Sequence, residues 1–556
     1  MTEMATWTAP GPGYWEWGGS HVPGVLTPIY GPLHKRTLEQ SMATMFERYG
    51  VPLGTMREEF VNGRAYTQLA PLFGKAGAKV PPKPALWLAT RLHPAFRART
   101  KAATKAWEGK IWRARTEEWR TSLRPALRDA NLAFQAEDLA AMDDEALLDH
   151  LHRVLAHVEV NALLHFDLHG DDMGPLGLFL GKGQELGIDP GEATAALAGH
   201  SPSTAAPLEA LHKVAVAMLE SGWTPDQPAP ASLDELRALG PAAASALQDY
   251  LDEYGWRIVT GYDLDARTVG ELPEALLANV LANVEPFDWH SARQAGDAAA
   301  DALRARIPAD KRPAFDEALG EARIALDMRD DNGPMTIEWP AGLARRALLA
   351  IGDRLVARSL LADREHVLEL DVPEIEAVVR GTSTLTLEMI GQRAVDRRAA
   401  SAVTPPSSLG EPTPPPDFSA FPEALARMTS MAMVAVSLME RAAVEEPTAG
   451  ALVQGLGVGT EPYTGRARVA KQPEEALATI EEGDVLVVPF TTPAYNAVLA
   501  VCGAVVTEEG GALAHAAVLA RELGIPAVVG AEAALSRIED GARVRVDPVA
   551  GTVSLV

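Results

Sequence analysis

The sequence contains one cysteine and no long apolar run, and its basic residues are fewer than its acidic residues. Because Cys502 is alone, no disulfide can form within the chain, and its place in the apolar run AVLAVCGAVV predicts a small core side chain. No apolar stretch approaches the roughly 18 residues that span a bilayer. The N-terminus also lacks the basic-then-apolar order of a signal peptide. We therefore expect a soluble, cytoplasmic protein without a membrane anchor.

Basic charge is scarce, with 50 Lys and Arg against 75 Asp and Glu and a formal net charge of -25. Nucleic acid and anionic membranes are therefore not expected as partners, since both require basic patches. Hydrophobic residues make up 47% of the 556 residues and charged residues 22%, which is typical of a globular protein with a sizeable core. The length predicts roughly two to four domains.

A proline-rich segment at residues 401–422 marks the clearest boundary in the chain. Proline removes an amide donor and favours extended polyproline geometry, so this segment predicts a semi-rigid spacer. Its prolines are Pro405, Pro406, Pro412, Pro414, Pro415 and Pro416. A helix with a methionine stripe is expected directly after it. The sequence therefore divides into residues 1–400, a linker and connecting helix at 401–449, and residues 450–556.

The two long regions differ in their patterning. Residues 1–400 are rich in Ala, Leu, Arg and Glu at helical spacing, apart from an irregular start of about thirty residues. Residues 450–556 alternate apolar strands such as DVLVVPF and GAVVTE with helices such as PEEALATI and HAAVLARELG, and they end in a hairpin pattern. We expect a multidomain protein with a large, mostly α-helical domain and a small α/β domain.

The stretch TEEGGALAHAAVLARELGIPAVVG places one histidine, His515, where a glycine pair leads into a helix. The positive end of the helix dipole disfavours imidazolium, so a neutral, nucleophilic ring is expected. Free amides of the first helical turn, and of Gly510 and Gly511, can receive an anion. These features suit a histidine that holds a phosphoryl group covalently. The alternative is a histidine that merely caps the helix.

This stretch resembles the phosphohistidine swivelling domain of the family that contains phosphoenolpyruvate synthase, pyruvate phosphate dikinase and rifampicin phosphotransferase. The residues that match the family pattern are Thr507, Gly510, Gly511, His515, Ala516, Ala517, Ala520, Arg521, Glu522, Gly524, Ile525, Pro526 and Ala527. The resemblance implies that His515 carries the phosphoryl group, with Thr507, Gly510, Gly511 and Arg521 at the phosphate. It also implies a domain that swings on its linkers between two active sites. Ala514 departs from the pattern, because a hydroxyl residue that could bond the phosphate or the ring is usual there.

The helical region is similar, over weaker motifs, to the substrate-binding part of the same enzymes. The segment HVPGVLTPIYGPL near residue 21 resembles its opening, and YLDEYGWRIVTGYDL resembles a Tyr-Gly-His-Arg…Glu-x-Asp-Leu pattern. Trp256 replaces the histidine of that pattern and Gly261 the glutamate. The resemblance makes Arg257, Asp263 and Trp256 candidates for the acceptor site. An internal ion pair between Arg257 and Asp263 is the alternative.

Histidines and tryptophans of the helical region offer further candidates. His165 and His169 in HVEVNALLHFDLHGDD are four residues apart and share one helix face. One of them could take the proton of an acceptor hydroxyl, whereas a metal site is not expected because no third ligand is evident. An aromatic wall would suit a phenol or another apolar alcohol, although most of these tryptophans are expected to be ordinary core residues. They are Trp87, Trp107, Trp112, Trp119, Trp223, Trp256, Trp289 and Trp339.

Family members that use ATP or phosphoenolpyruvate carry an ATP-grasp module ahead of these parts or a phosphoenolpyruvate-binding barrel after them, and neither is evident here. We therefore expect a separate ATP-grasp subunit, holding ATP and Mg²⁺, that phosphorylates His515. This division resembles the phenylphosphate synthase and alkylphenol phosphorylation systems. The expected function is a phosphotransferase subunit that passes the group to the hydroxyl of a small, phenol-type acceptor. The alternatives are a rifampicin-type antibiotic phosphotransferase without its ATP module and a non-catalytic scaffold, which the departures at Ala514, Trp256 and Gly261 keep open.

Overall fold

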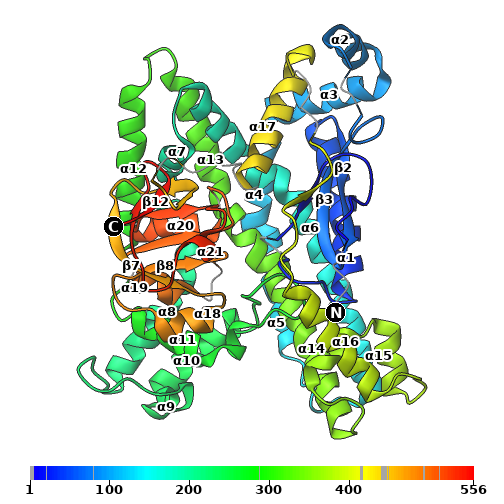
Figure 1. Cartoon of the computed structure of the whole chain (residues 1–556), viewed down its shortest axis with the longest axis vertical. Coiled ribbons are helices and arrows are strands. Elements are labelled where there is room, and N and C mark those ends of the chain that lie inside the picture. The colour runs from blue at the N-terminus through cyan, green and yellow to red at the C-terminus, as the bar shows by residue number, and fades with distance from the viewer. Residues whose placement is uncertain are drawn as a thin grey trace. The chain divides into compact units, whose positions relative to one another are not determined.

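The computed structural model describes residues 6–19, 22–78, 81–286, 288–412, 418–439, 448, 450–491, 495–512 and 514–556 (Figure 1). The chain folds into two compact units. The first comprises Met1–Asp171, Gly261–Arg267 and Asn332–Ser430, and the second comprises Asp172–Thr260, Thr268–Asp331 and Met431–Val556. Helices from the middle of the chain therefore group with the C-terminal α/β region, and the units do not coincide with the predicted boundaries near 400 and 450. An amphipathic pattern states that a helix has a buried face but not which partner covers it.

The first unit is mostly helical, as predicted. Helix ends follow local capping: the Asp371 side chain accepts from the Glu374 amide, and the Glu374 carboxylate accepts from the Asp371 amide. Its α-helices are α1 (Tyr30–Tyr49), α2 (Lys83–Leu92), α3 (Pro94–Gly109), α4 (Ile111–Glu118), α5 (Arg124–Gln135), α14 (Trp339–Ala357), α15 (Val372–Val379) and α16 (Leu387–Ser401), with the residues of α6 (Asp144–Glu185) up to 171 and of α17 (Glu423–Met439) up to 430. Shorter turns are η1 (Trp119–Leu123), η3 (Pro334–Glu338), η4 (Arg364–Glu369) and η5 (Phe418–Ala420).

A four-stranded sheet in the first unit was not predicted. Its order is β2-β3-β1-β4, formed by β1 (Trp15–Trp17), β2 (Leu53–Val61), β3 (Arg64–Pro71) and β4 (Ser408–Leu409). Asn62 and Gly63 both have positive φ, 51° and 76°, as a two-residue hairpin turn between β2 and β3 requires. The region was expected to be predominantly helical, and this hairpin was not identified, although an Asn-Gly pair between two alternating runs is the signal for one.

The first part of the proline-rich segment belongs to this sheet and is not a free spacer. Strand β4 pairs with β1. The Arg64 guanidinium donates to the carbonyls of Ser401, at 2.6 Å, and Val403, at 2.8 Å, and the Tyr66 hydroxyl donates to the carbonyl of Pro406 at 2.8 Å. The spacer prediction was therefore wrong up to residue 409, because proline is tolerated at a sheet edge.

Other parts of the predicted linker lie outside the described residues. These are residues 413–417, which include Pro414, Pro415 and Pro416, and residues 440–447 and 449. The predicted helix after the prolines is present as α17, and the boundary between the two units falls within it.

The second unit contains the remaining helices and one large sheet. Its α-helices before the sheet are α7 (Pro190–Ala195), α8 (Pro202–Glu220), α9 (Leu233–Ala238), α10 (Pro241–Tyr254), α11 (Pro273–Ala282), α12 (Trp289–Arg306) and α13 (Arg312–Gly333) up to residue 331, with the 3-10 turn η2 (Val269–Glu271) and the end of α6. One apolar core of this unit gathers Leu176, Phe179 and Phe315 with Ala512 of the α/β region. The helices and the α/β region of this unit therefore share buried apolar surface.

The sheet of the second unit has the order β5-β12-β11-β7-β8-β9-β10-β6, and the neighbours β7, β8, β9 and β10 run parallel. Its strands are β5 (Val453–Gln454), β6 (Leu456–Val458), β7 (Tyr463–Val469), β8 (Val485–Val488), β9 (Ala504–Thr507), β10 (Ala527–Val529), β11 (Arg543–Asp547) and β12 (Thr552–Leu555). Its helices are α18 (Pro473–Thr479), α19 (Asn496–Val501), α20 (His515–Leu523) and α21 (Ala534–Arg537), labelled around the sheet in Figure 1. The predicted strands, helices and final hairpin of this region are confirmed. Strands β8, β9 and β10 are buried along their whole length, which is why they read as continuous apolar runs.

None of the helices in the described part of the chain combines the length and the apolar character that a membrane crossing needs.

Candidate active site around His515

The loop between β9 and α20 lies at the carboxyl end of a parallel strand, the edge where open α/β sheets bind ligands. Thr507 ends β9 and is fully buried. Its hydroxyl donates to the carbonyl of Glu509 at 2.6 Å, and its carbonyl accepts from the Ala531 amide at 2.8 Å. The Thr507 hydroxyl thus holds the loop in its shape, and its predicted role at the phosphate stays a prediction.

Gly510 makes the turn that starts α20 at the histidine. Its φ is +111°, and a Cβ added there would lie 2.8 Å from the Cβ of Ala514. No side chain larger than hydrogen fits this position without movement of the loop. The Ala514 amide donates to the carbonyl of Gly511 at 3.0 Å, which closes the turn before His515.

The His515 ring is held through one nitrogen. Its Nδ1 lies 2.8 Å from Oγ1 of Thr491, a buried residue that follows β8. The hydroxyl that the family pattern places at position 514 is therefore supplied to the ring from another segment. Within the described residues Nε2 has no hydrogen-bond partner, and it is not among the enclosed polar atoms. When Nδ1 carries the proton and donates to Thr491, the lone pair of the ring lies on the accessible Nε2.

Burial lowers the pKa of His515 to about 4, so the ring is neutral at physiological pH. This agrees with the neutral state expected from the sequence, and burial, which desolvates the imidazolium, is a cause that the sequence did not indicate. The residue keeps partial surface exposure even so. A ring of this kind combines a permanently available lone pair with access from outside.

Arg521 lies six residues further along α20 and contacts other groups. Its Nε and Nη2 lie 3.2 and 3.0 Å from Oε1 of Glu522, whose other oxygen accepts from the Gly199 amide at 3.0 Å. Nη1 of Arg521 is buried without a hydrogen-bond partner. The charge of Arg521 also helps to hold down the pKa of Asp330, which burial raises overall. These contacts join α20 to the helical part of the second unit and leave the predicted phosphate role of Arg521 as a prediction.

The acceptor-site candidates are divided between the two units. His165 lies in the first unit, with Nδ1 3.2 Å from Oδ1 of Asn332 and 3.0 Å from Oγ1 of Thr336. Its ring centroid is 4.7 Å from that of His169, so the two rings are neighbours, as their spacing predicts. Among the described residues there is no group of three or more His, Cys, Asp or Glu that could hold a metal.

The pattern that resembles Tyr-Gly-His-Arg…Glu-x-Asp-Leu is also divided. Asp263 lies in the first unit, where it accepts from the amide and hydroxyl of Thr27 at 2.7 and 2.6 Å. Burial raises its pKa to about 7. Arg257 and the half-buried Trp256 lie in the second unit, with the Arg257 guanidinium 4.6 Å from the ring centroid of Tyr254. The partners described for Asp263 and Arg257 are thus within their own units.

Three residues near Asp263 escaped the sequence analysis. The charge of Asp263 acts on the pKa values of Tyr30 and His34, and Glu58 acts on both as well. Tyr30 and His34 are four residues apart on α1, directly at the end of the quoted segment HVPGVLTPIYGPL. Their helical spacing was visible, whereas the approach of Glu58 from β2 is a tertiary contact that no local pattern encodes.

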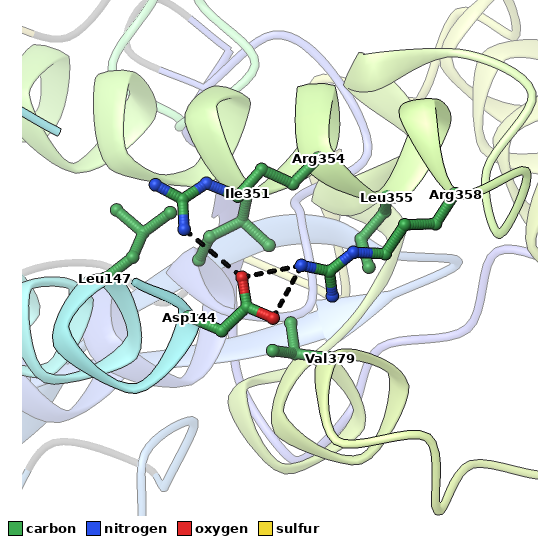
Figure 2. Close-up of a pocket in the computed structure, with 7 residues that line it drawn as sticks. All are labelled: Asp144, Leu147, Ile351, Arg354, Leu355, Arg358 and Val379. Atoms are coloured by element: carbon green, nitrogen blue, oxygen red, sulfur yellow. Dashed lines mark hydrogen bonds and ion pairs between the residues drawn. The ribbon is translucent and has the colours of Figure 1, made fainter. Parts of the chain in front are cut away.

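A small pocket in the first unit lies at an ion-pair cluster (Figure 2). Asp144 accepts from Arg354 at 3.2 Å and from Arg358 at 2.8 Å. Burial works to raise the pKa of Asp144, but these hydrogen bonds lower it overall. The residues that line the pocket are Asp144, Leu147, Ile351, Arg354, Leu355, Arg358 and Val379. The carboxylate is already paired with both cations, and none of the predicted site residues lines this pocket.

Two regions of the chain match known protein families, and one of them contains the turn at His515. Residues 480–551 match the mobile domain of PEP-utilising enzymes. Residues 182–330 match the fourth domain of rifampicin phosphotransferase. Over these two regions the chain is similar to phosphoenolpyruvate-utilising enzymes, and the resemblance seen in the sequence is confirmed there.

Individual relatives cover different parts of the chain. Rifampicin phosphotransferase from Streptomyces sviceus is 33% identical over 339 residues, which are 58% of this chain and 36% of that protein. Chondramide synthase cmdD from Chondromyces crocatus is 30% identical over 459 residues, 75% of this chain and 11% of that protein. Phosphoenolpyruvate synthase from Aeropyrum pernix is 45% identical over 107 residues, 19% of this chain and 13% of that protein. The match to the first of these relatives spans about a third of its length.

Proposed function

We propose that this chain is part of a phosphotransferase in which Nε2 of His515 accepts a phosphoryl group and passes it to a hydroxyl. One observation carries the proposal: a neutral imidazole starts a helix, with Nδ1 held by Thr491 and Nε2 accessible. The match of residues 480–551 to a PEP-utilising mobile domain supports it. The N-cap of α20 is Ala514 and not His515, and no side chain caps this helix end.

The proposed chemistry has two transfers. In the first, Nε2 forms a bond to the terminal phosphorus of the donor while the bond from that phosphorus to its leaving oxygen breaks. Positive charge then develops on the ring, and the Thr491 hydroxyl stabilises it by accepting a hydrogen bond from Nδ1–H. In the second, an acceptor oxygen attacks the same phosphorus and the P–N bond breaks. The chain contributes mainly position and electrostatic stabilisation, through a turn that Gly510 keeps tight.

We assign the donor site to a separate ATP-grasp subunit that holds ATP with Mg²⁺ in the cytoplasm. The two regions that match known families are a mobile domain and a fourth domain. We place the nucleotide on the separate subunit and not on either of these regions. The role of this chain at the donor site is to present Nε2 with its lone pair free.

The acceptor that we propose is a small aromatic alcohol of the phenol type, bound by the helical first unit. A rifampicin-type antibiotic is the second candidate acceptor. The observation that favours it is the relative named rifampicin phosphotransferase, which matches 58% of this chain.

The test is phosphorylation of the full chain with labelled ATP in the presence of ATP-grasp proteins. We expect an acid-labile, base-stable label that the His515→Ala variant lacks. Phenol and rifampicin are then added separately, and the labelled product identifies the acceptor class. A wild-type chain that stays unlabelled with every ATP-grasp protein, and behaves as His515→Ala does, would favour the non-catalytic scaffold.

A further inference from the structure

A second histidine, His34 on α1, is also held through Nδ1, in this case by a buried carboxylate. Its Nδ1 lies 2.9 Å from Oε2 of Glu58 on β2, and the Glu58 side chain is only 1% exposed. In the part of the chain that the structure describes, Nε2 of His34 has no partner, and it is not among the enclosed polar atoms. The His34 side chain is 11% exposed. The ring is thus oriented from one side and accessible from the other.

The surroundings of His34 combine aromatic rings with unused polar atoms. The Tyr30 ring centroid lies 5.5 Å from the His34 ring, and the Phe166 ring meets it edge-on at 5.5 Å. Oε1 of Glu58 is buried and has no partner among the described residues. Burial by itself lowers the pKa of His34, whereas the negative charges of Glu58 and Asp263 raise it. The charges outweigh burial, so the net shift of this pKa is upward.

A comparable pair in the same unit shows what a purely structural arrangement looks like. Nδ1 of His150 lies 2.9 Å from Oε2 of Glu137, the same distance as in the first pair. Arg153 donates to both oxygens of Glu137, at 2.8 and 2.7 Å, and the His150 side chain is only 1% exposed. Both carboxylate oxygens of that pair accept hydrogen bonds. In the pair of His34 and Glu58, one carboxylate oxygen has no partner among the described residues and one ring nitrogen is accessible.

We propose that His34 is the general base that takes the proton of the acceptor hydroxyl, with Glu58 as the residue that positions it and with the rings of Tyr30 and Phe166 beside the acceptor. The inference rests on the proposed function and names its acceptor side. The acceptor oxygen bonds to phosphorus, its proton moves to Nε2 of His34, and the electron pair of the breaking P–N bond returns to the His515 ring. Glu58 stabilises the imidazolium that forms on His34.

The same groups define the substrate class as a phenolic hydroxyl. A phenol loses its proton near pH 10, as the tyrosine side chain does, and this is within reach of an imidazole whose charged form is favoured by Glu58 and Asp263. An aliphatic alcohol is a much weaker acid.

The experiment uses the full chain, with phosphoramidate as a small-molecule phosphoryl donor and phenol as the probe acceptor. His515 is first phosphorylated, and loss of phosphohistidine is then followed with and without phenol. We expect phenol to accelerate the loss in the wild type and to yield phenyl phosphate. His34→Gln should be phosphorylated to the same extent but lose roughly 100-fold or more of the acceleration, since general bases contribute about 10²–10⁴-fold. His150→Gln is the matched control and should behave as the wild type.

A second variant tests Glu58 as a positioning residue. The titratable groups that face His34 are Glu58 on β2, Asp263 in the 261–267 segment and Tyr30 on its own helix. Glu58→Gln removes a negative charge, so the pH at which phenol-dependent transfer reaches half its maximum should shift, with partial rescue by Glu58→Asp. A merely structural role would lower the rate without moving that pH.

The outcomes separate the two proposals. If His515 is labelled but phenol accelerates its loss equally in the wild type and in a folded His34→Gln variant, this inference is overturned and the proposed function stands. No acceleration by phenol in the wild type also overturns it. If His515 cannot be labelled by phosphoramidate or by any ATP-grasp protein, the proposed function fails and this inference fails with it.

Discussion

The hydrogen bond between Thr491 and His515 gives the sharpest test of the site. Thr491→Val keeps the shape of the side chain and removes the hydroxyl that lies 2.8 Å from Nδ1. Without it, the tautomer with a proton on Nδ1 buries an unpaired donor, which costs about 1–3 kcal/mol. The other tautomer places the proton on Nε2 and cannot attack phosphorus. At about 1.4 kcal/mol for each tenfold change, the reactive population falls by about 5- to 150-fold.

The assay is the rate at which phosphoramidate phosphorylates His515 in the full chain at neutral pH. We expect Thr491→Val to be slower by that factor, while Thr491→Ser, which keeps the hydroxyl, stays close to the wild type. The ¹⁵N shifts of the labelled imidazole should report the change of tautomer, with the ring still neutral because burial is the cause of its low pKa. Equal rates for the valine variant and the wild type, with no tautomer change, would refute the assignment of Nε2 as the nucleophile.

Three further predictions concern stability. Gly510→Ala should lower the free energy of unfolding by about 1–3 kcal/mol more than Gly541→Ala, because both have positive φ but only the first crowds a neighbour, and chemical denaturation measures the difference. The pKa of His515 is about 4 in the folded chain, below its ordinary 6.5, so stability is lost as pH falls between these values, by at most about 3 kcal/mol; His515→Gln should reduce that loss in melts from pH 7 to 4. Arg64→Met leaves two carbonyls of the 401–403 segment without their donor and should cost about 2–4 kcal/mol, with faster proteolysis near residue 405, whereas unchanged proteolysis would show that the segment is held by other contacts.

The C-terminal α/β region could be predicted closely because its signals are local. Buried parallel strands are continuous apolar runs in the sequence, and the turn before His515 is indicated there by a pair of adjacent glycines. The Asn62-Gly63 hairpin carried an equally local signal but lay in a region whose overall composition favours helix. The proline-rich segment was predicted wrongly because proline lacks a backbone N–H donor, and such a residue fits at a sheet edge as well as in a spacer.

The site itself was only partly within reach of the sequence. His515 was found from its motif, yet the cause of its neutral state and its partner Thr491 depend on what surrounds the ring in three dimensions. His34 was missed because its chemistry comes from Glu58, which lies on a strand of an unpredicted hairpin.

The sequence by itself determined the family resemblance around His515, the choice of that residue as the candidate nucleophile and the order of the α/β elements, because each of these depends on contiguous residues. The tertiary structure alone decided which helices share a unit with that domain, which hydroxyl holds the His515 ring and which carboxylate orients His34. The physical reason is that burial and hydrogen bonds between distant segments depend on packing, and packing is set by the whole fold and not by any one stretch of it.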